Sequence, residues 1–351
     1  MLNKIFKTKK KVFVGMSGGV DSAVSAYILK HSGYDVTGVF IKTWQPDYIE
    51  CTWKQDRLDA MRISAQLDMP FITLDLESEY KKHVIDYLLD EYKNNRVPNP
   101  DIFCNKYIKF GAFYEYAMKN GADFVATGHY AQIKDGHIVN AIDENKDQTY
   151  FLYQIDKKIL SKIIFPIGHL KKDQVRDIAK QNNLFVADKK DSQGICMLGD
   201  ISIKDFLRRE LEIQPGNVVN VAGGIIGTHD GVQLYTLGER HGFQVKKKSV
   251  NDEPYFVIEK RSDTNELVVS HERLDIKMKT NINLTETNWL IDNTKSVVFA
   301  RFRYRGQLRQ VNLNQNENKF EILEKCDDIV GGQSAVFYTS EGQVIGGGII
   351  V

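Results

Sequence analysis

The chain has 351 residues, of which 42% are hydrophobic and 26% are charged, and its formal net charge is only +1. This length and composition are typical of a soluble globular protein with two or three domains and a substantial core. The balanced charge excludes a global basic field, so a nucleic-acid partner would have to be held by local patches. Four cysteines without a C-x-x-C pair argue against a disulfide scaffold and against a zinc module.

The same features indicate the compartment. No apolar run approaches the roughly 20 residues that a membrane-spanning helix needs. The lysine-rich N-terminus, from Lys4 to Lys11, lacks the apolar segment of a signal peptide. We therefore expect a cytoplasmic protein without a membrane contact, whose cysteines stay reduced and available for chemistry.

A glycine-rich loop follows the first predicted strand, which covers residues 12–15. The loop reads Ser17-Gly18-Gly19-Val20-Asp21-Ser22, and an apolar helical pattern begins after it. Glycines let backbone N–H groups approach a ligand closely, and the helix directs its positive end at the loop, so the pattern favours a phosphate ligand. It is neither a Walker A motif, because no Gly-Lys-Ser/Thr closes it, nor a G-x-G-x-x-G dinucleotide turn. An ordinary glycine turn is the alternative for the loop taken alone.

Strands and helices continue to alternate along the first part of the chain. Further strands are predicted at 35–41, 70–74 and 123–127, and helices at 21–32, 54–68 and 78–94. This alternation predicts an α/β fold with a doubly wound parallel sheet that is covered on both faces. Ligands of such sheets bind beyond the carboxyl ends of the strands. Because Gly15, Ile41 and Gly128 fall at these ends, we expect three separate stretches to form one nucleotide pocket.

The setting of Cys104 suggests chemistry. It follows Pro98-Asn99-Pro100, which predicts a rigid extended turn, and it lies close to a helix predicted to begin near Lys106. The helix end and either Lys106 or Lys109 would stabilise its thiolate. A small buried hydrophobic side chain is an equally good interpretation of a lone cysteine.

Cys196 lies in a different setting, the polar, turn-forming stretch after Lys189. We expect it on an exposed loop, and a sulfur carrier must be exposed because another protein has to deliver sulfur to it. Cys51 and Cys326 show no comparable setting, and we expect both to be structural.

The predicted secondary structure changes after residue 205, from alternating strands and helices to mostly strands. A helix at 203–211 is followed by short strands between glycines, which predict a β-rich middle domain. From about residue 273 we expect a small barrel that ends in a hairpin around Glu341-Gly342. Residues 296–305 alternate as a strand, with Arg301, Arg303 and Arg305 on one face. This stripe is either a solvated strand face or a basic patch for nucleic acid. The predicted domains are 1–205, 206–272 and 273–351.

Five motifs occur in one order along the chain. They are Ser17 to Ser22, Pro98-Asn99-Pro100-Asp101 with Cys104-Asn105, Thr127-Gly128-His129-Tyr130, Lys146-Asp147-Gln148 with Tyr150-Phe151-Leu152, and Asp191-Ser192 with Gly194-Ile195-Cys196. The first resembles the pyrophosphate loop of the ATP-pyrophosphatases, and the whole set resembles the tRNA-specific 2-thiouridylase family. The resemblance is dense through residue 216 and looser afterwards, where residues 236–242 still resemble the family pattern.

The resemblance implies roles for the matching positions. ATP would be bound by Gly15, Met16, Ser17, Gly18, Gly19, Val20, Asp21, Ser22, Ile41 and Gly128. Cys196 would accept sulfur as a persulfide, Cys104 would be the partner thiol, and the two would end as a disulfide. Asp101 would act as an acid or base, with a turn-stabilising role as the alternative. The tRNA would be contacted by Asn99, Pro100, Asp101, His129, Lys146, Asp147, Gln148, Arg303, Tyr304 and Gln333.

The implied reaction is the ATP-dependent replacement of the 2-oxygen of a wobble uridine by sulfur, with magnesium assisting ATP and with no metal site of the protein itself. The implied partners are the tRNA, also bound by the middle domain, and a cysteine desulfurase or sulfur-relay protein, and we expect a monomer. One alternative is another ATP-pyrophosphatase that acts on a small metabolite, which would need no paired thiols. The other is a nucleotide-regulated RNA-binding protein without chemistry, in which both cysteines would be dispensable.

Overall fold

The computed structural model of the chain describes residues 9–48, 53–190, 201–245, 253–272, 280–292, 296–324, 326 and 329–351. The chain divides into two compact units. The first comprises Met1–Val84, Asp101–Asp200 and Glu341–Val344, and the second comprises Ile85–Pro100, Ile201–Ser340 and Ile345–Val351. Among the helices of the described ranges, none has the length and apolar character needed to cross a membrane.

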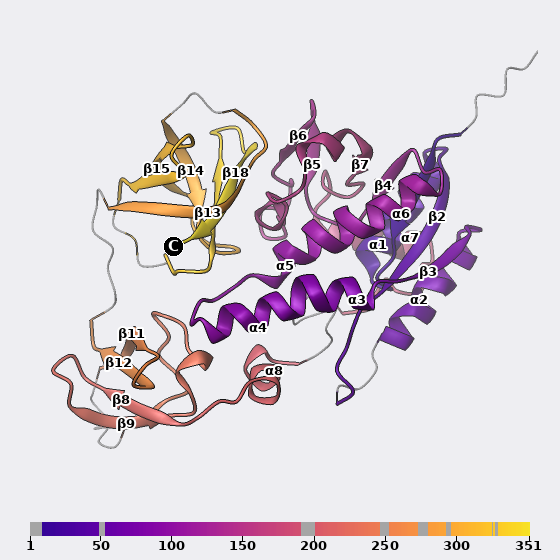
Figure 1. Cartoon of the computed structure of the whole chain (residues 1–351). Helices are drawn as coiled ribbons and strands as arrows, with labels where there is room; N and C mark the ends of the chain where they lie inside the picture. The colour runs from indigo at the N-terminus through magenta and orange to yellow at the C-terminus, as the bar shows by residue number, and fades with distance from the viewer. Residues whose placement is uncertain are drawn as a thin grey trace, which may run out of the picture. The chain divides into compact units, whose positions relative to one another are not determined.

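The first unit is built on a five-stranded parallel sheet (Figure 1). Its strands, in the order β3-β2-β1-β4-β7, are β3 (Phe71–Asp75), β2 (Asp35–Lys42), β1 (Lys11–Gly15), β4 (Phe124–Ala126) and β7 (Ile163–Ile164). Val12 of the central strand pairs with Val36 on one side and with Phe124 on the other. The predicted parallel sheet is confirmed. The two-residue β7 is too short to leave a periodic signal in the sequence.

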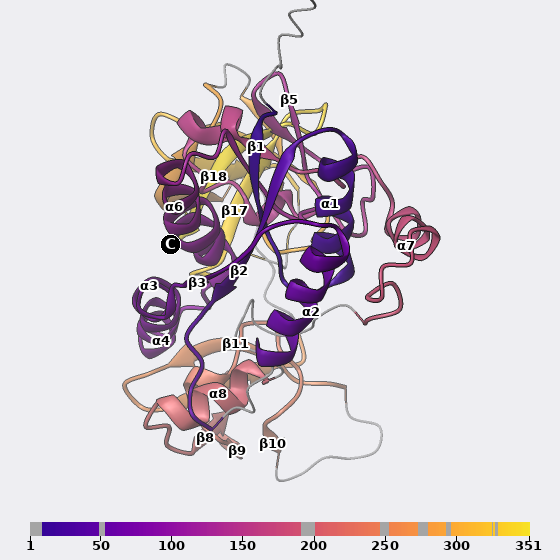
Figure 2. The same cartoon turned by 90° about the vertical axis from the view of Figure 1, so that its right-hand side faces the viewer.

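Helices cover both faces of this sheet. Figure 2 shows α1 (Val20–His31) and α2 (Trp53–Gln66) on one side of β1 and β2, and α6 (Phe113–Lys119) on the other. α7 (Lys172–Gln181) packs beside α1. Ala23 and Ala26 of α1 are buried against the strands, so the core lies between the helices and the sheet. The doubly wound arrangement is therefore confirmed.

Two helical runs contain π-helical turns. One consists of α3 (Glu77–Tyr80), η1 (Lys81–Ile85) and α4 (Asp86–Lys93), and the other of α5 (Pro100–Phe103), η2 (Cys104–Ala112) and α6. The second run begins at Pro100 and not near Lys106 as predicted, because the fixed φ of proline suits the first turn of a helix. Cys104 consequently lies inside a helical run and not at its N-terminus. π-Helical turns are frequent at functional sites.

A buried carboxylate organises the short elements between β4 and α7. These elements are the antiparallel pair β5 (Gln132–Lys134) and β6 (His137–Val139) and the 3-10 helices η3 (Thr149–Phe151) and η4 (Lys157–Lys162). Asp147 is 2% exposed and accepts hydrogen bonds from the backbone N–H of Ala141 and from the hydroxyl of Thr149, both at 2.6 Å. The turn that carries Gln148 is fixed as a result.

The second unit contains the predicted β-rich middle part. After α8 (Ile203–Glu210), a five-stranded sheet has the order β10-β9-β8-β12-β11. Its strands are β8 (Gly216–Val219), β9 (Ile225–His229), β10 (Gln244–Val245), β11 (Phe256–Arg261) and β12 (Glu266–Ser270), with the one-turn helix η5 (Val232–Leu234) between β9 and β10. β8 and β12 pair in parallel, and the other neighbours are antiparallel.

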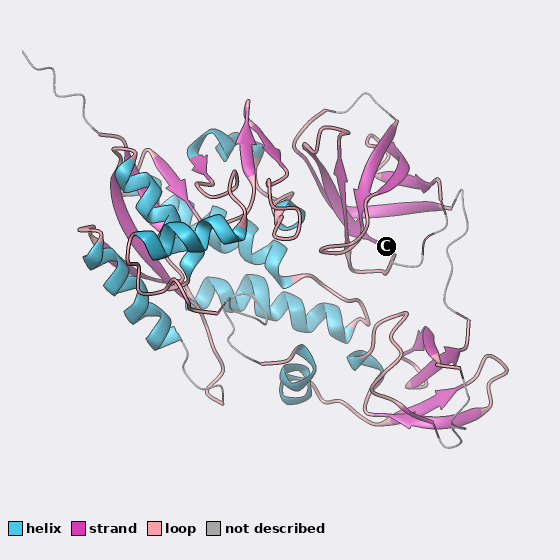
Figure 3. Cartoon of the chain, turned by 180° about the vertical axis from the view of Figure 1, so that it is seen from behind, coloured by secondary structure: helices cyan, strands magenta, loops and turns pink. Residues whose placement is uncertain are grey.

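The C-terminal strands close into a six-stranded barrel, and strands outnumber helices throughout this part of the chain in Figure 3. In the order β13-β16-β15-β14-β17-β18 they are β13 (Asn281–Trp289), β16 (Lys319–Ile322), β15 (Arg309–Asn314), β14 (Val297–Arg301), β17 (Ser334–Tyr338) and β18 (Val344–Ile350). The rings of Phe302, Phe320 and Phe337 fill its core, with neighbouring centroids 5.4 Å apart. The predicted barrel and terminal hairpin are confirmed.

The arginine stripe predicted along residues 296–305 is wrong. β14 ends at Arg301, and the chain then turns, with the N–H of Gly306 donating to the carbonyl of Arg303 at 2.9 Å. Glycine is favoured at the fourth position of such a turn. Phe302 is buried in the barrel core, but Arg303 and Arg305 lie exposed in the turn and not on a strand face.

Candidate active site

The glycine-rich loop between β1 and α1 is closed by its own serines. The N–H of Ser17 donates to Oγ of Ser22 at 3.2 Å, and that hydroxyl donates to the carbonyl of Gly19 at 3.0 Å. Gly18 has a φ of +75°, and a Cβ there would lie 2.3 Å from the carbonyl oxygen of Asp56, so only glycine fits. Within the described chain no side chain caps α1 at Gly19. The first N–H groups of the helix are therefore available to a phosphate.

The carboxyl ends of three neighbouring strands meet at this loop. Gly15 ends β1, Ile41 is next to last in β2, and Gly128 follows β4 by two positions. A Cβ on Gly128 would lie 2.9 Å from the backbone of Asp21 and Ser22, so the turn after β4 touches the start of α1. The structure thus brings together the three stretches that were predicted to form one pocket, as the fold class requires.

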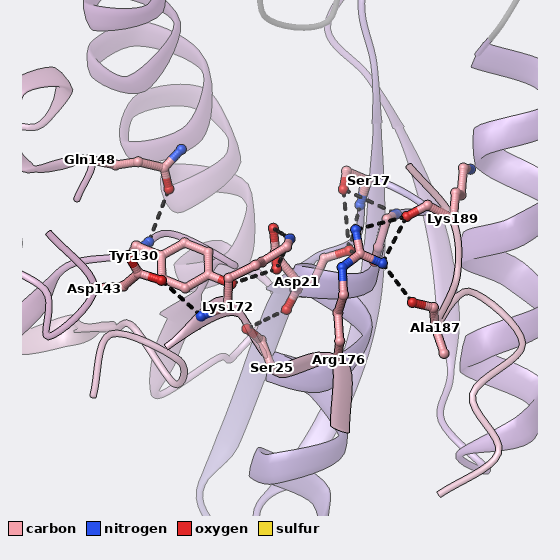
Figure 4. Close-up of polar contacts among 12 residues, drawn as sticks. Ser17, Asp21, Ser25, Tyr130, Asp143, Gln148, Lys172, Arg176, Ala187 and Lys189 are labelled. Carbon is pink, nitrogen blue, oxygen red and sulfur yellow. Dashed lines mark hydrogen bonds and ion pairs between the residues drawn. The ribbon is translucent and has the colours of Figure 1, made fainter. Parts of the chain in front are cut away.

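A lysine from far along the chain reaches the loop (Figure 4). Lys172, the first residue of α7, donates from Nζ to both carboxylate oxygens of Asp21, at 2.7 and 2.9 Å. The hydroxyl of Tyr130 donates to Oδ1 of the same carboxylate at 2.9 Å, and its ring centre lies 5.8 Å from the Lys172 ammonium. Because only 11% of the Lys172 side chain is exposed, solvent screens this ion pair less than it would a surface pair. The loop is therefore contacted by a cation that its own sequence lacks.

Gln148 holds Tyr130 in position. The N–H of Tyr130 donates to Oε1 of Gln148 at 3.0 Å, and the N–H of Gln148 donates to the carbonyl of Tyr130 at 2.9 Å. At the start of α7, the backbone N–H of Lys172 donates to Oδ2 of Asp143 at 2.9 Å. The carboxylate of Asp21 is thus oriented by side chains that are themselves fixed.

A second lysine contacts the loop directly. Nζ of Lys189 donates to the carbonyl of Gly18 at 3.0 Å, to Oδ1 of Asp56 at 2.8 Å and to Oδ2 of Asp59 at 2.7 Å. Burial by itself would lower the pKa of Lys189, but the hydrogen bonds that it donates to Asp56 and Asp59 outweigh this effect and raise the pKa. The amine consequently stays protonated next to the phosphate loop.

Cys104 is fully buried in η2. Its neighbour Asn105 donates to the carbonyl of Asp101 at 3.0 Å and to that of Phe151 at 3.3 Å, which ties the helix to η3. The ammonium of Lys106 lies 5.0 Å from the ring centre of Tyr107. Lys106, which follows Cys104 by two residues in the helix, thus lies over the ring of Tyr107.

Lys109 contacts a buried histidine. Its Nζ lies 3.4 Å from Nε2 of His129, whose Nδ1 lies 2.7 Å from Oγ1 of Thr127. Because an ammonium group only donates, Nε2 must accept and Nδ1 must carry the hydrogen. Burial and the charge of Lys109 hold the pKa of His129 well below its usual range, so the ring is neutral. Since a π-helix bonds residue i to residue i+5, Lys109 and Cys104 share one side of η2.

Comparison with known proteins identifies the family. The models described as tRNA methyl transferase HUP domain, tRNA methyl transferase PRC-barrel domain and aminomethyltransferase beta-barrel domain match residues 10–200, 204–271 and 279–350. The tRNA-specific 2-thiouridylase MnmA of Oceanobacillus iheyensis is 43% identical, over 97% of this chain and 94% of its own. That of Ligilactobacillus salivarius is 42% identical, over 98% and 96%. This chain belongs to the tRNA-specific 2-thiouridylase family.

A solved structure is also similar over part of this 2-thiouridylase. It is the U34-tRNA thiolase NcsA from Methanococcus maripaludis, which is 19% identical and has a TM-score of 0.36, over 60% of this chain and 70% of its own.

Other predicted positions of the 2-thiouridylase belong to the start of α5, to the second unit or to residues beyond the described ranges. Cys196 and Cys51 are outside the described residues. Cys326 is buried in the barrel core, which agrees with a structural role. Asp101 lies in the first turn of α5 in the first unit. The second unit contains Asn99, Pro100, Arg303, Tyr304 and Gln333.

Two lysines that contact the loop, Lys172 and Lys189, are not among the residues predicted from the sequence. Each acts on the loop through tertiary packing, at separations of 151 and 171 residues from its loop partner. A weak local signal existed for Lys172, because a lysine at the first position of a helix, where the helix dipole disfavours a cation, needs an anionic partner. For Lys189 the sequence shows no comparable signal.

Proposed function

We propose that this protein is a tRNA-uridine 2-sulfurtransferase that uses ATP to replace the 2-oxygen of a wobble uridine by sulfur. The observation that carries the proposal is the presence, in one unit, of a phosphate loop with the buried cation Lys172 and of a helix that buries Cys104. Thiolation of an amide-like carbonyl needs both, since the oxygen must be activated before sulfur can replace it. Membership of the 2-thiouridylase family, over nearly the whole chain, supports the same reaction.

The first step activates the carbonyl. The 2-oxygen of uridine attacks the α-phosphate of ATP, so that a new O–P bond forms and the bond to the β-phosphate breaks. Pyrophosphate leaves with its charge spread over several oxygens. The N–H groups at the start of α1 and the ammonium of Lys172 are positioned to stabilise this charge. The products of the step are adenylated uridine and pyrophosphate.

The residues of the loop suit a magnesium ion that arrives with ATP. Magnesium prefers oxygen ligands and usually binds through one or two carboxylates together with substrate phosphates. In the described chain no cluster of three or more His, Cys, Asp or Glu forms a metal cage, and Asp21 offers one carboxylate at the phosphate loop. Asp21 would therefore hold the ion, which when bound neutralises part of the phosphate charge. Lys172 would be available to the phosphates once Asp21 turns to the metal.

The second step delivers sulfur. Either the terminal sulfur of a Cys196 persulfide attacks C2 directly, or the Cys104 thiolate first attacks Sγ of Cys196 and releases hydrosulfide as the nucleophile. A C–S bond forms at C2, and the C–O bond to AMP breaks, so that AMP leaves. In the direct route the product is still bound to Cys196 through an S–S bond, and the Cys104 thiolate then attacks Sγ of Cys196, breaks that bond and frees the 2-thiouridine. Cys104 and Cys196 end as a disulfide, which a thiol reductant must reduce. Asp101, three residues before Cys104, would take up or supply the proton.

The RNA contacts of this protein are also part of the proposal. Asn99, Pro100 and Asp101 would meet the target base, and Lys146, Arg303, Tyr304 and Gln333 would contact the tRNA. Arg303 is exposed in a turn and suits a phosphate. Asp147, Gln148 and His129 would act through the elements that they fix, because Asp147 and His129 are only 2% and 6% exposed.

Two of the matching family models are described as tRNA methyl transferase domains. A phosphate loop with a basic side chain and a cysteine-bearing helix fit ATP-dependent thiolation better, because methyl transfer requires neither group.

We further propose a cytoplasmic monomer of three domains, 1–205, 206–272 and 273–351, that receives sulfur from a cysteine desulfurase or a sulfur-relay protein.

Mass spectrometry of tRNA nucleosides tests the proposal. The purified protein, ATP, magnesium and a persulfide donor should convert uridine at the wobble position to 2-thiouridine. C104S and C196S should abolish the product while ATP binding survives, and C326S, with its cysteine in the barrel core, is the matched control. Undiminished thiolation by C196S would contradict the proposed mechanism.

A further inference from the structure

We propose that His83 and Tyr107 form a stacking platform for an unpaired base of the tRNA, one that neighbours the target uridine. The inference rests on the proposed function, because it names a part of the substrate that the enzyme would hold beside its cysteine-bearing helix. Neither side chain belongs to the phosphate loop or to the predicted tRNA contacts. Both lie in the first unit.

The rings of His83 and Tyr107 are stacked on each other. Their centroids lie 4.5 Å apart, with an angle of 17° between the ring planes. His83 lies in η1 and Tyr107 in η2, and α3, which leads into η1, packs against η2. The buried ring of Phe103 supports Tyr107 at a centroid distance of 5.9 Å. His83 and Tyr107 are themselves half-buried, so the stack presents aromatic surface to which a further flat ring can be added.

Cations lie next to the stacking platform. The ammonium of Lys106 lies 5.0 Å from the ring centre of Tyr107, and Lys82 is exposed beside His83 in η1. Burial and the charge of Lys82 lower the pKa of His83, although the charge of Glu79 opposes them. The imidazole is therefore uncharged at neutral pH. Rings beside cations are the combination that binds single-stranded RNA, because bases stack on the rings while ammonium groups meet the phosphates.

The helical run that carries His83 is tied to the edge of the sheet where the phosphate loop lies. Lys42, the last residue of β2, donates from Nζ to Oε2 of Glu77 at the start of α3, at 2.7 Å. The ammonium of Lys81 in η1 lies 5.9 Å from the ring centre of Trp44, which follows the carboxyl end of β2 by two residues. The stacking platform thus belongs to the carboxyl edge of the parallel sheet, where ligands of this fold class bind.

Tyr107 ties the stacking platform to the cysteine-bearing helix. It follows Cys104 by three residues, which is less than one turn of η2, since a π-helix bonds residue i to residue i+5. An enzyme that reacts with a base must take this base out of its stack, at a cost of a few kcal/mol. A neighbouring base that stacks on the protein offsets part of this cost. The stacking platform would therefore help to expose the uridine close to Cys104.

Two other roles would use the same geometry. The rings would suit the adenine of ATP, which also has a flat aromatic face, or they would only pack η1 against η2. A base of the RNA fits better than adenine, because the exposed Lys82 and the half-buried Lys106 accompany the rings and suit the phosphates on either side of a stacked nucleotide. The test is arranged so that each role gives a different result.

A double-mutant cycle between protein and RNA tests the stacking platform in the full-length enzyme. The RNA is tRNA that is abasic at one or the other neighbour of the wobble uridine, and the protein variant is Y107L, which removes the ring but keeps apolar bulk. An abasic site at one of the two positions should weaken binding to the wild type by roughly 5- to 150-fold, the range for loss of one stacked base. Y107L should bind intact tRNA more weakly by a similar factor and should not distinguish it from the abasic tRNA.

Further variants separate a lost ring from a damaged protein. Y107F keeps the ring and should behave as the wild type does. H83L removes the other ring and should give the result of Y107L. The ATP affinity of each variant should equal that of the wild type, which shows that the nucleotide-binding unit is folded.

Tyr34 supplies the matched control. It is half-buried, its ring lies 6.3 Å from that of Phe124, and it precedes β2 at the opposite, amino edge of the sheet. Y34L should therefore show the full abasic effect. An abasic effect as large in Y107L as in the wild type would overturn the stacking platform and leave only a packing role. Weaker ATP binding by Y107L with unchanged tRNA binding would overturn it in favour of adenine.

Failure of the stacking platform differs from failure of the proposed function. Normal thiolation by the wild type without an abasic effect at either position would overturn the stacking platform alone. A wild type that made no 2-thiouridine from intact tRNA, ATP and a persulfide donor would overturn the proposed function and the stacking platform together.

Discussion

Nζ of Lys172 lies 2.7 Å from Oδ1 of Asp21, although 151 positions separate the two residues in the chain. The pair joins the first residue of α7 to the phosphate loop, which lies between β1 and α1 near the start of the chain. In the proposed reaction each partner would have its own role, the carboxylate of Asp21 toward magnesium and the ammonium of Lys172 toward the phosphates. In this arrangement the two charges neutralise each other, so neither is left unpaired beside the loop.

Replacement of Lys172 by methionine should weaken binding of ATP and of inorganic pyrophosphate but hardly affect AMP. A hydrogen bond to a charged group contributes about 1.5–3 kcal/mol, so the expected loss is roughly 10- to 100-fold in the dissociation constant. AMP has no β-phosphate or γ-phosphate for this ammonium to contact. Isothermal titration calorimetry with the three ligands measures the effect.

The neighbouring residue provides the control for this experiment. Lys171 is exposed, and K171M should bind all three ligands as the wild type does. If K172M weakened AMP and ATP equally, Lys172 would be a general support of the pocket and not a pyrophosphate ligand.

A methyl group added at Gly128 should disturb the pocket more than one added at Gly15. The Cβ at Gly128 would lie 2.9 Å from backbone atoms of Asp21 and Ser22, which cannot move without shifting the loop. The nearest atoms to a Cβ at Gly15 lie at 3.6 Å or more, which is ordinary van der Waals contact. Overpacking of this kind costs about 1–3 kcal/mol, so G128A should lower the thermal unfolding temperature and ATP affinity. G15A should unfold close to the wild-type temperature, and equal unfolding temperatures for the two variants would contradict the packing at Gly128.

The parallel sheet and its loop could be predicted because their signals are local. Apolar strands end at Gly15 and shortly before Gly128, and the phosphate loop lies between a strand and a helix in the sequence itself. Lys172 and Lys189 could not be found in the same way, since only the packing of α7 beside α1 brings them to the loop. A charge whose partner is 151 residues away leaves no periodic pattern.

The two errors in the fold have local causes. Pro100 was interpreted as part of an extended turn, but proline is equally suited to begin a helix, and this moved Cys104 from a helix end to a helix interior. Alternation of side chains from 296 to 305 was interpreted as one strand. A turn can continue such an alternation for a few residues, and the glycine at position 306 marked the turn.

Replacement of His129 by glutamine should reduce the dependence of stability on pH. The pKa of folded His129 lies well below the value near 6.5 of the unfolded chain, because the ring is buried and faces Lys109. Below about pH 6.5 the unfolded state therefore binds more protons, and the folded state loses stability as the pH falls toward the folded pKa. One such group changes the free energy of unfolding by at most about 1.4 kcal/mol per pH unit. Glutamine can accept from Lys109 and donate to Thr127, but it does not titrate.

Thermal unfolding of the wild type and H129Q between pH 7.5 and 5.5 measures this effect. The wild-type unfolding temperature should fall further on acidification than that of H129Q. The exposed His241 provides the comparison, and H241Q should follow the wild type across the range. Parallel curves for wild type and H129Q would contradict the lowered pKa, because they would show that His129 binds its proton equally well in the folded and unfolded states.

Replacement of Arg303 by glutamine should weaken tRNA binding and make it less sensitive to salt. Arg303 is exposed at the barrel turn, and a cation that contacts phosphate releases counterions when RNA binds. Loss of one phosphate contact should reduce the slope of log affinity against log salt by about 1. Filter binding of tRNA at several potassium chloride concentrations measures the slope.

Arg261 is a matched surface arginine that is paired with Glu259 at 2.9 Å, and R261Q should leave the slope unchanged. An unchanged slope in R303Q, or an equal reduction in both variants, would show that Arg303 makes no specific phosphate contact.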